Sequence, residues 1–294
     1  MKVVITGGRG FVGGHLAAAA IAAGDEVVTL DRSDVDVADP VALRARFLEI
    51  RPRVVFHLAA LSHVGESWND PDAVERVNVG GTVAALEAAD AAGAAAIVVV
   101  GSAEEYGRVR PDEVPLRETR PVAPASPYGA SKAEATRRAI EFAATTAMRV
   151  VIARPFNHTG PGQSTKFLIP ALAARIRAAG REGTGEIAVG NLDPIRDIGD
   201  VRDVVRAYRL LADQGGSGEV YNVCAGVGVS VREIAERLVA ADGHELELRV
   251  DESLVRPVDV PVLIGDHTKL SAATGWQPEH DLATTLRDVL AATP

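Results

Sequence analysis

The chain opens with a β-branched run that leads directly into glycines, Val3-Val4-Ile5-Thr6-Gly7-Gly8-Arg9-Gly10-Phe11-Val12-Gly13. The residues before the glycines predict a strand, and the alanine-rich residues 11–23 predict a helix that stops at Gly24. A strand, a glycine loop and a helix in this order are typical of a dinucleotide-binding turn, where N–H groups at the helix start face a pyrophosphate. The sequence therefore predicts a nicotinamide dinucleotide site that includes Gly7, Gly10, Phe11 and Val12.

The second predicted strand, residues 26–30, ends at two charged residues, Asp31 and Arg32. Asp31 lies eighteen residues after Gly13, close to the spacing of the acid that binds the adenosine ribose. This acid favours NAD(H), whereas Arg32 and Arg9 could pair with the 2′-phosphate of NADP(H). The cofactor therefore stays open between NAD(H) and NADP(H), with a slight lean to NAD(H).

Residues 34–37 read Asp-Val-Asp-Val, and this alternation predicts a short third strand. Its end, at Asp36 and Val37, is expected to reach the adenine of the cofactor. A turn or a helix start is an equal alternative for Asp36, because aspartate side chains favour both.

Residues 54–60 predict a buried parallel strand that ends in Leu58, Ala59 and Ala60. The small side chains at this end would let a flat ligand lie against the backbone, so we assign all three to the cofactor site. His57 lies inside the strand, and we interpret it as a core histidine with its hydrogen bonds satisfied rather than as a catalyst.

Tyr128 and Lys132 are four residues apart on a predicted helix that begins at Pro127, so their side chains share one face. An ammonium beside a phenol lowers the pKa of the phenol, which then exchanges protons near neutral pH. The chain has only four lysines and otherwise uses arginine, which indicates a specific need for Lys132. Ser102 directly follows the predicted strand over 94–101 and should point into the crevice where ligands bind.

The order of predicted elements is β-α repeated up to residue 153, which predicts an α/β fold with a doubly wound parallel sheet of the Rossmann type. After Arg154 the pattern changes, and a second, smaller α/β lobe interleaves with the first. We expect residues 1–153 and about 195–224 in the dinucleotide-binding domain, and about 154–194 and 225–294 in the second lobe.

The composition excludes several classes of partner. The 294 residues carry a net charge of −9, which argues against nucleic acid and against anionic membranes. Cys224 is the single cysteine, so an intrachain disulfide is impossible and a reducing compartment is expected. The sequence shows no signal peptide and no apolar run long enough to cross a membrane, so we expect a cytoplasmic protein. No metal site is expected.

Four features stand in the order seen in one family: the glycine loop, Leu58-Ala59-Ala60, Ser102 and Tyr128-x-x-x-Lys132. The chain resembles the extended short-chain dehydrogenase/reductases, the NAD-dependent epimerase/dehydratase family that acts on nucleotide sugars. Within it the chain is most similar to the GDP-4-keto-6-deoxy-D-mannose reductases. The stretches that carry this likeness are Gly101-Ser102-Ala103-Glu104-Glu105-Tyr106-Gly107, Arg154-Pro155-Phe156-Asn157-His158-Thr159-Gly160-Pro161-Gly162-Gln163 and Leu254-Val255-Arg256-Pro257.

The resemblance implies hydride transfer between the nicotinamide and a sugar carbon, with Ser102, Tyr128 and Lys132 as the catalytic residues. Tyr128 and Lys132 would also contact the cofactor. The resemblance further implies a GDP-linked substrate and a homodimer built from the helices around Asn78 and after Tyr128. The residues implied to bind the nucleotide sugar are Glu104, Asn157, Asn191, Arg196, Arg256 and Asp259.

Two other reactions stay open, a 4,6-dehydratase and a 4-epimerase, which both recycle their cofactor within each turnover. Many dehydratases place acids after the catalytic serine or threonine, and here that position is Ala103 followed by Glu104. The alanine weakens the dehydratase interpretation without removing it. Glu104 either serves as an acid–base or binds a sugar hydroxyl, and we favour binding. A non-enzymatic nucleotide sensor is disfavoured, because the three catalytic residues are all present.

Overall fold

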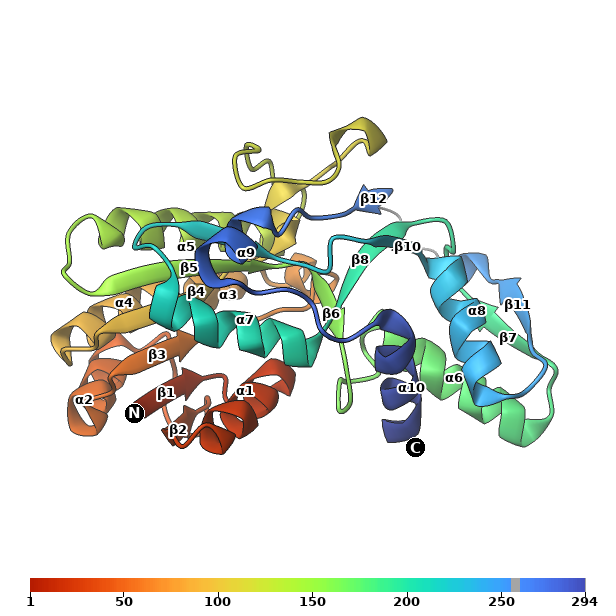
Figure 1. The fold of residues 1–294 in the computed structure, drawn as a ribbon, viewed down its shortest axis with the longest axis horizontal. Coiled ribbons are helices and arrows are strands. Elements are labelled where there is room, and N and C mark those ends of the chain that lie inside the picture. The colour runs from red at the N-terminus through yellow and green to blue at the C-terminus, as the bar shows by residue number, and fades with distance from the viewer. Residues whose placement is uncertain (255–259, 294) are drawn as a thin grey trace.

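The computed structural model describes residues 1–254 and 260–293, and Figure 1 shows them as two lobes. The N-terminal lobe is built around a parallel sheet, and the C-terminal helix ends in the smaller lobe. The described strands of the large sheet follow the order β2-β1-β3-β4-β5-β9. Their bounds are β1 (Lys2–Thr6), β2 (Glu26–Leu30), β3 (Val54–His57), β4 (Ala96–Val100), β5 (Arg149–Pro155) and β9 (Val220–Val223).

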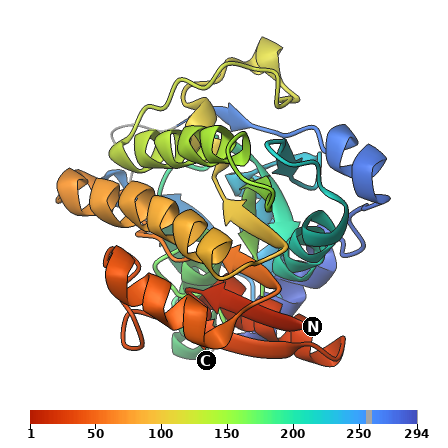
Figure 2. The same ribbon diagram turned by 90° about the vertical axis from the view of Figure 1, so that its left-hand side faces the viewer.

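All neighbouring strands of this sheet pair in parallel, which confirms the predicted doubly wound α/β fold. Because helices cover both faces, the strands are apolar on both sides, as in the buried run Val54-Val55-Phe56. The view turned by 90° shows the same arrangement, with helices on both faces of the sheet (Figure 2). The helices of this lobe are α1 (Phe11–Ala22), α2 (Pro40–Ile50), α3 (Pro71–Glu75), α4 (Gly81–Ala91), α5 (Pro127–Ala143), α7 (Val201–Gln214) and α9 (Thr268–Thr274).

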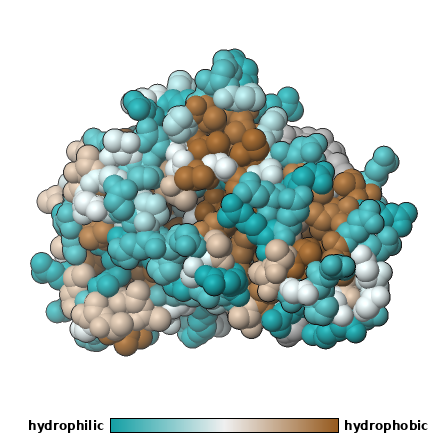
Figure 3. Space-filling model, turned by 45° about the vertical axis from the view of Figure 1, so that its right-hand side comes forward, coloured by the Kyte–Doolittle hydropathy of each residue, from teal (hydrophilic) through white to brown (hydrophobic). Residues whose placement is uncertain are grey.

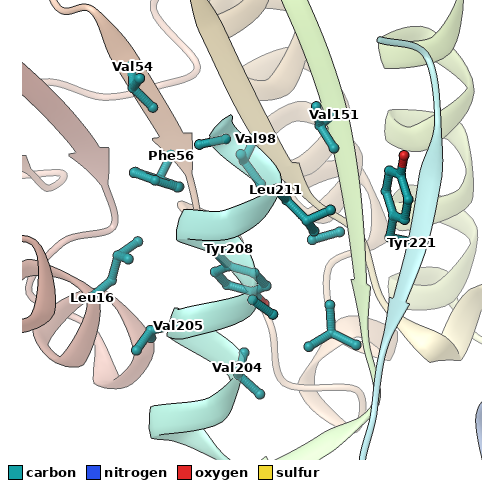
Figure 4. Packing of buried hydrophobic residues seen from close by; sticks show 14 of the residues in the cluster. Leu16, Val54, Phe56, Val98, Val151, Val204, Val205, Tyr208, Leu211 and Tyr221 are labelled. Carbon is teal, nitrogen blue, oxygen red and sulfur yellow. The ribbon is translucent and has the colours of Figure 1, made fainter. Parts of the chain in front are cut away.

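Two apolar layers hold these helices to the sheet. On one face α1 and α7 pack Leu16, Tyr208 and Leu211 against strand residues such as Phe56 and Val98 (Figure 4). On the other face α2, α4 and α5 pack on the alternate strand residues. The alternation of side chains along each strand therefore divides one sheet between two cores.

The smaller lobe contains a second sheet, in which β8 pairs with β6, β10 and β12, and a separate pair of strands, β7 and β11. Three helices form its core, and Ser230 caps one of them, α8, because its hydroxyl accepts the N–H of Glu233. The elements are β6 (Asn157–Thr159), α6 (Leu168–Glu182), β7 (Glu186–Val189), β8 (Ile195–Asp200), β10 (Gly228–Ser230), α8 (Val231–Asp242), β11 (Glu247–Val250), β12 (Val262–Leu263) and α10 (Leu282–Ala292). The division into a cofactor domain and a substrate lobe stays a prediction.

The predicted third strand over residues 34–37 is wrong, because these residues form turns. The N–H groups of Asp34 and Val35 both donate to the carbonyl oxygen of Asp31, and the carboxylate of Asp36 accepts the N–H of Ala38. Aspartate side chains that bond to nearby backbone compete with strand pairing. Strand β2 is therefore the edge of the sheet, and Val37 packs into the core instead.

One further boundary differs from the sequence prediction. Strand β3 ends at His57, so Leu58, Ala59 and Ala60 lie just beyond the strand. Residues 71–91 form a helical run around Asn78, and the centre of this run, Arg76–Gly80, is a π-helical turn. Such turns are rare, and in this one Asn78 hydrogen-bonds with Leu61 and Ser131.

Candidate active site

The glycine loop and the predicted catalytic residues meet at the carboxyl ends of the parallel strands. Strand β1 ends at Thr6, beside His57 at the end of β3, and the glycine loop follows β1 directly. Ser102 follows β4, and α5 brings Tyr128 and Lys132 to the same edge. This edge is where parallel α/β sheets bind their ligands.

The glycine loop has the close packing that a dinucleotide turn requires. Gly7 has a φ of +67°, and a Cβ there would lie 2.9 Å from the backbone nitrogen of Ala59. A Cβ on Gly13 would lie 2.2 Å from the carbonyl oxygen of Gly7. Gly10 precedes α1, and no side chain caps that helix and no acid lies in its first turn. The exposed N–H groups fit an anionic pyrophosphate.

Replacing Gly13 with alanine is expected to lower the affinity for the reduced dinucleotide about tenfold or more, since the loop must move and lose backbone hydrogen bonds of about 0.5–1.5 kcal/mol each. Gly14→Ala is the matched control, because a Cβ at Gly14 meets nothing within 4 Å. The control is expected to keep the affinity and to raise helix stability by about 0.5–1 kcal/mol. Fluorescence titration and urea unfolding measure the two effects, and equal affinities for both variants would contradict this account of the loop.

The turn predicted to hold the adenosine is organised by Arg9 rather than by Arg32. The carboxylate of Asp31 accepts the backbone N–H of Arg9 at 2.8 Å. The Arg9 guanidinium donates to Ser33 at 2.7 Å and to Asp34 at 3.1 Å, whereas Arg32 is 87% exposed at its side chain. The sequence prediction missed the roles of Ser33 and Asp34, because only the turn over 31–35 brings them to Arg9.

Helix α5 begins where the sequence predicts. The Ser126 hydroxyl accepts the N–H of Gly129 at 3.0 Å, and Pro127 occupies the first turn. Tyr128 and Lys132 are both buried, and the Lys132 ammonium donates to the carbonyl oxygen of Val100 at 2.7 Å. The two side chains therefore face the sheet together and not bulk solvent.

The predicted lowering of the Tyr128 pKa is wrong, because that pKa is raised. Burial raises the pKa of Tyr128 to about 12, and a hydrogen bond with the Ser102 side chain offsets only part of this rise. Burial also lowers the pKa of Lys132 to about 8, while Glu105 opposes that change. Desolvation penalises the charged form of each group and is the largest cause of both shifts. The protein's own groups thus keep Tyr128 protonated at neutral pH.

Ser102 stands at the start of a tight 3₁₀ turn, Ala103–Tyr106. Its hydroxyl oxygen accepts the N–H of Glu104 at 3.2 Å, and its own N–H donates to the Glu105 carboxylate at 2.9 Å. The side chain and the backbone N–H of Ser102 are thus both held by hydrogen bonds within this turn. The Ser102 side chain also hydrogen-bonds with Tyr128, and this contact lowers the pKa of the phenol.

Two further polar residues, Asn78 and His57, are buried near the predicted ones. Asn78, in the π turn, accepts the N–H of Leu61 at 2.8 Å and donates to Ser131 at 2.9 Å. Nδ1 of His57 bonds to Thr6 at 2.8 Å, but Nε2 has no partner among the described residues. The interpretation of His57 as a fully satisfied core histidine is therefore wrong for one of its nitrogens. Burial lowers the pKa of His57 to about 3, so the ring stays neutral.

The predicted substrate residues are less closely grouped. Glu104 lies near enough to Tyr128 to raise the pKa of that phenol by its charge. Asn157 and Asn191 are exposed, and Asn191 accepts the N–H of Asp193. Arg196 lies on β8 and donates to the carbonyl oxygen of Ile195. The remaining two predicted residues, Arg256 and Asp259, lie outside the described residues.

The face of the molecule in Figure 3 is mostly polar, and apolar surface gathers in its upper middle and on its right-hand side. Among residues 1–254 and 260–293, none of the helices has the length and apolar character to cross a membrane. The same residues contain no group of three or more His, Cys, Asp or Glu side chains placed to hold a metal ion.

Comparison with known proteins agrees with this arrangement. The family model described as GDP-mannose 4,6 dehydratase matches residues 33–289. GDP-6-deoxy-D-mannose reductase of Pseudomonas aeruginosa is 36% identical over 98% of this chain and 96% of its own length. UDP-glucose 4-epimerase of Streptomyces lividans is 32% identical over 96% of this chain and 93% of its own length.

Solved structures are similar over nearly the whole chain. RMD from Pseudomonas aeruginosa complexed with NADPH has a TM-score of 0.90 and 35% identity, covering 99% of this chain and 98% of that one. UDP-glucose 4-epimerase of Thermus thermophilus in complex with NAD has a TM-score of 0.88 and 29% identity, with coverage of 99% and 98%. With its glycine loop, Ser102, Tyr128 and Lys132 at one sheet edge, the chain belongs to the GDP-mannose 4,6-dehydratase family of extended short-chain dehydrogenase/reductases.

Proposed function

We propose that the protein is an NAD(P)H-dependent 4-ketoreductase of a nucleotide-linked 4-keto-6-deoxyhexose. The preferred substrate is GDP-4-keto-6-deoxy-D-mannose, reduced to GDP-D-rhamnose or its C4 epimer. The observation that carries the proposal is the buried Tyr128 hydroxyl beside Ser102, with a pKa raised to about 12. Reduction of a ketone needs a protonated acid, and this phenol keeps its proton at neutral pH. The 36% identical reductase of Pseudomonas aeruginosa supports the same choice.

The bound reduced nicotinamide would supply the hydride. In this proposal Tyr128 gives its proton to the oxygen at C4 of the sugar, and Ser102 donates a hydrogen bond to that oxygen. Lys132 contacts the cofactor ribose and places a positive charge in the site. Glu104 binds a sugar hydroxyl, and Asn157, Asn191 and Arg196, with Arg256 and Asp259, bind the nucleotide diphosphate.

The test mixes the purified protein with GDP-4-keto-6-deoxymannose and either NADPH or NADH. The expected result is the loss of one reduced nicotinamide for each GDP-6-deoxyhexose formed, followed by absorbance and by ion-exchange chromatography. An epimerase or a dehydratase regenerates its cofactor, so UDP-glucose and GDP-mannose are assayed in parallel with oxidised cofactor. Turnover of either compound without any reduction of the keto-sugar would replace the ketoreductase by that alternative.

Replacing Asp31 with alanine is expected to move the cofactor preference away from NADH. The Asp31 carboxylate lies beside Arg9, where it would accept a ribose hydroxyl and repel a 2′-phosphate. Loss of a charged hydrogen bond predicts a change of about tenfold or more in the ratio of kcat/KM for NADH over NADPH. If this ratio stays at the wild-type value in steady-state assays, Asp31 does not contact the ribose.

We also propose a homodimer that forms through the helical run over residues 71–91, which contains Asn78, and through α5. These helices lie next to each other on one face of the large sheet, and Ile140 of α5 is 41% exposed there. Ala130 and Gly80 are small and exposed, which would let a second pair of helices approach closely. Light scattering at micromolar concentration is expected to give twice the chain mass, and a monomer under these conditions would reject the proposal.

A further inference from the structure

A buried ion pair lies directly behind Ser102. The side chains of Glu105 and Arg154 are 0% and 4% exposed. Nη2 and Nε of Arg154 both donate to one carboxylate oxygen of Glu105, at 2.7 and 2.9 Å. Burial raises the pKa of Glu105, and the adjacent guanidinium offsets part of that cost. A buried pair of this kind costs desolvation energy, so it is weak evidence of stability alone.

The other carboxylate oxygen of Glu105 faces Ser102, just beyond the carboxyl end of β4. It accepts the N–H of Ser102 at 2.9 Å and the hydroxyl of Thr136, on α5, at 3.0 Å. This close approach is possible because residue 101 is glycine, where a Cβ would lie 2.4 Å from the same oxygen. One carboxylate thus connects the Ser102 turn, helix α5 and strand β5.

The pair is fixed in turn by a polar chain that reaches the far edge of the sheet. Nη1 of Arg154 donates to the Tyr106 hydroxyl at 3.0 Å, and this hydroxyl donates to Asn222 of β9 at 2.8 Å. The Arg154 guanidinium also lies over the Tyr106 ring, 4.8 Å from its centre. Asn222 donates to the carbonyl oxygen of Leu116 at 2.9 Å. Each member has its partners, so the network is rigid.

We propose that Glu105 is a positioning residue, which holds the Ser102 backbone in place through its carboxylate and is itself held by Arg154. The inference rests on the proposed catalytic role of Ser102. A hydroxyl that must hydrogen-bond to a reacting oxygen needs a backbone that is fixed in position. A shift of about 1 Å in such a group can lower the rate about 10²-fold. Glu105 never touches the substrate in this scheme.

The charge of Glu105 also reaches the other catalytic residues. It raises the pKa of Lys132, and it contributes to the raised pKa of Tyr128. Arg154 faces this carboxylate directly, and Tyr106 is connected to it through Arg154. A test must therefore separate the hydrogen bond to Ser102 from the charge.

Two double variants make this separation. Glu105→Gln with Arg154→Met removes both charges and keeps an amide oxygen that accepts the N–H of Ser102. Glu105→Leu with Arg154→Met also removes both charges, but it removes the acceptor as well. Neither variant leaves a buried charge without its partner, which would destabilise the fold for reasons unrelated to Ser102.

The leucine variant is expected to lower kcat about 10- to 100-fold relative to the glutamine variant, with KM for the keto-sugar and the cofactor within about twofold. Hydrogen-exchange mass spectrometry is expected to show faster exchange at the Ser102 amide, about tenfold, in the leucine variant only. Urea unfolding confirms that both variants are folded. Equal kcat or equal amide exchange in the two variants would overturn the positioning role.

The exchange measurement does not depend on the substrate. If the wild-type protein fails to reduce the keto-sugar, the proposed function fails while the exchange comparison still decides the contact between Glu105 and Ser102. If the wild-type protein is active and both double variants match it in kcat, the positioning inference fails while the proposed function stands.

Discussion

Tyr128→Phe is expected to lower kcat for reduction of the keto-sugar by about 10²- to 10⁴-fold, the usual contribution of a general acid. The phenylalanine ring keeps the packing of a side chain that is only 8% exposed, and it removes the hydroxyl that bonds with Ser102. Affinity for the reduced cofactor should change little, since the loss falls on the transition state. Stopped-flow and steady-state assays with the reduced cofactor measure both quantities.

Tyr221→Phe is the matched control for this prediction. Tyr221 is another buried tyrosine, 4% exposed, and it packs from β9 in the apolar layer of the large sheet (Figure 4). Loss of its hydroxyl should leave kcat near the wild-type value. A Tyr128→Phe protein with wild-type turnover would remove Tyr128 from the catalytic residues, whatever the control shows.

Lys132→Met is expected to lower kcat/KM for the reduced cofactor about 10- to 150-fold, since hydrogen bonds to a charged group contribute about 1.5–3 kcal/mol. Methionine fills the space of the lysine stem without the ammonium, which in this structure donates to the carbonyl oxygen of Val100. Lys166→Met is the control, because Lys166 is 66% exposed and pairs with Glu66 on the surface. A similar small loss in both variants would show that the ammonium at position 132 is dispensable.

The same lysine sets an expected pH dependence. Its pKa is lowered to about 8 by burial, so the ammonium is present at neutral pH and is lost as the pH rises through about 8. The phenol of Tyr128, with a pKa near 12, keeps its proton over this range. The rate of reduction is therefore expected to fall above about pH 8 in the wild-type protein, and this fall is expected to be absent in Lys132→Met.

The effect of Lys132 on folding stability cannot cause this fall in rate above about pH 8. In the unfolded chain the lysine keeps its ordinary pKa of 10.5, so above pH about 8 the unfolded state binds more protons than the folded state at this group. Stability contributed by Lys132 thus rises with pH while activity falls. Urea unfolding at each pH separates the two effects, and a rate that follows the unfolding midpoint instead would exclude titration of Lys132 as the cause.

Local signals in the sequence were sufficient for the elements that are strongly patterned. The strand before Gly7, the strand at Glu26–Leu30 and the start of α5 at Pro127 were predicted because each depends on β-branched runs, glycine or a cap within a few residues. The strand expected over residues 34–37 failed for the opposite reason. Its alternation was real, but turn hydrogen bonds to Asp31 satisfied the backbone first.

The chain by itself predicted which residues carry the proposed chemistry: the glycines of the first turn, Ser102, Tyr128 and Lys132. Their environment was decided only by tertiary structure. Desolvation depends on everything packed around a group, so the raised pKa of Tyr128 and the buried contact of Glu105 with Ser102 and Arg154 could not be read from spacing. Residues 102, 105 and 154 come together because neighbouring parallel strands align their carboxyl ends, a long-range fact that no local pattern contains.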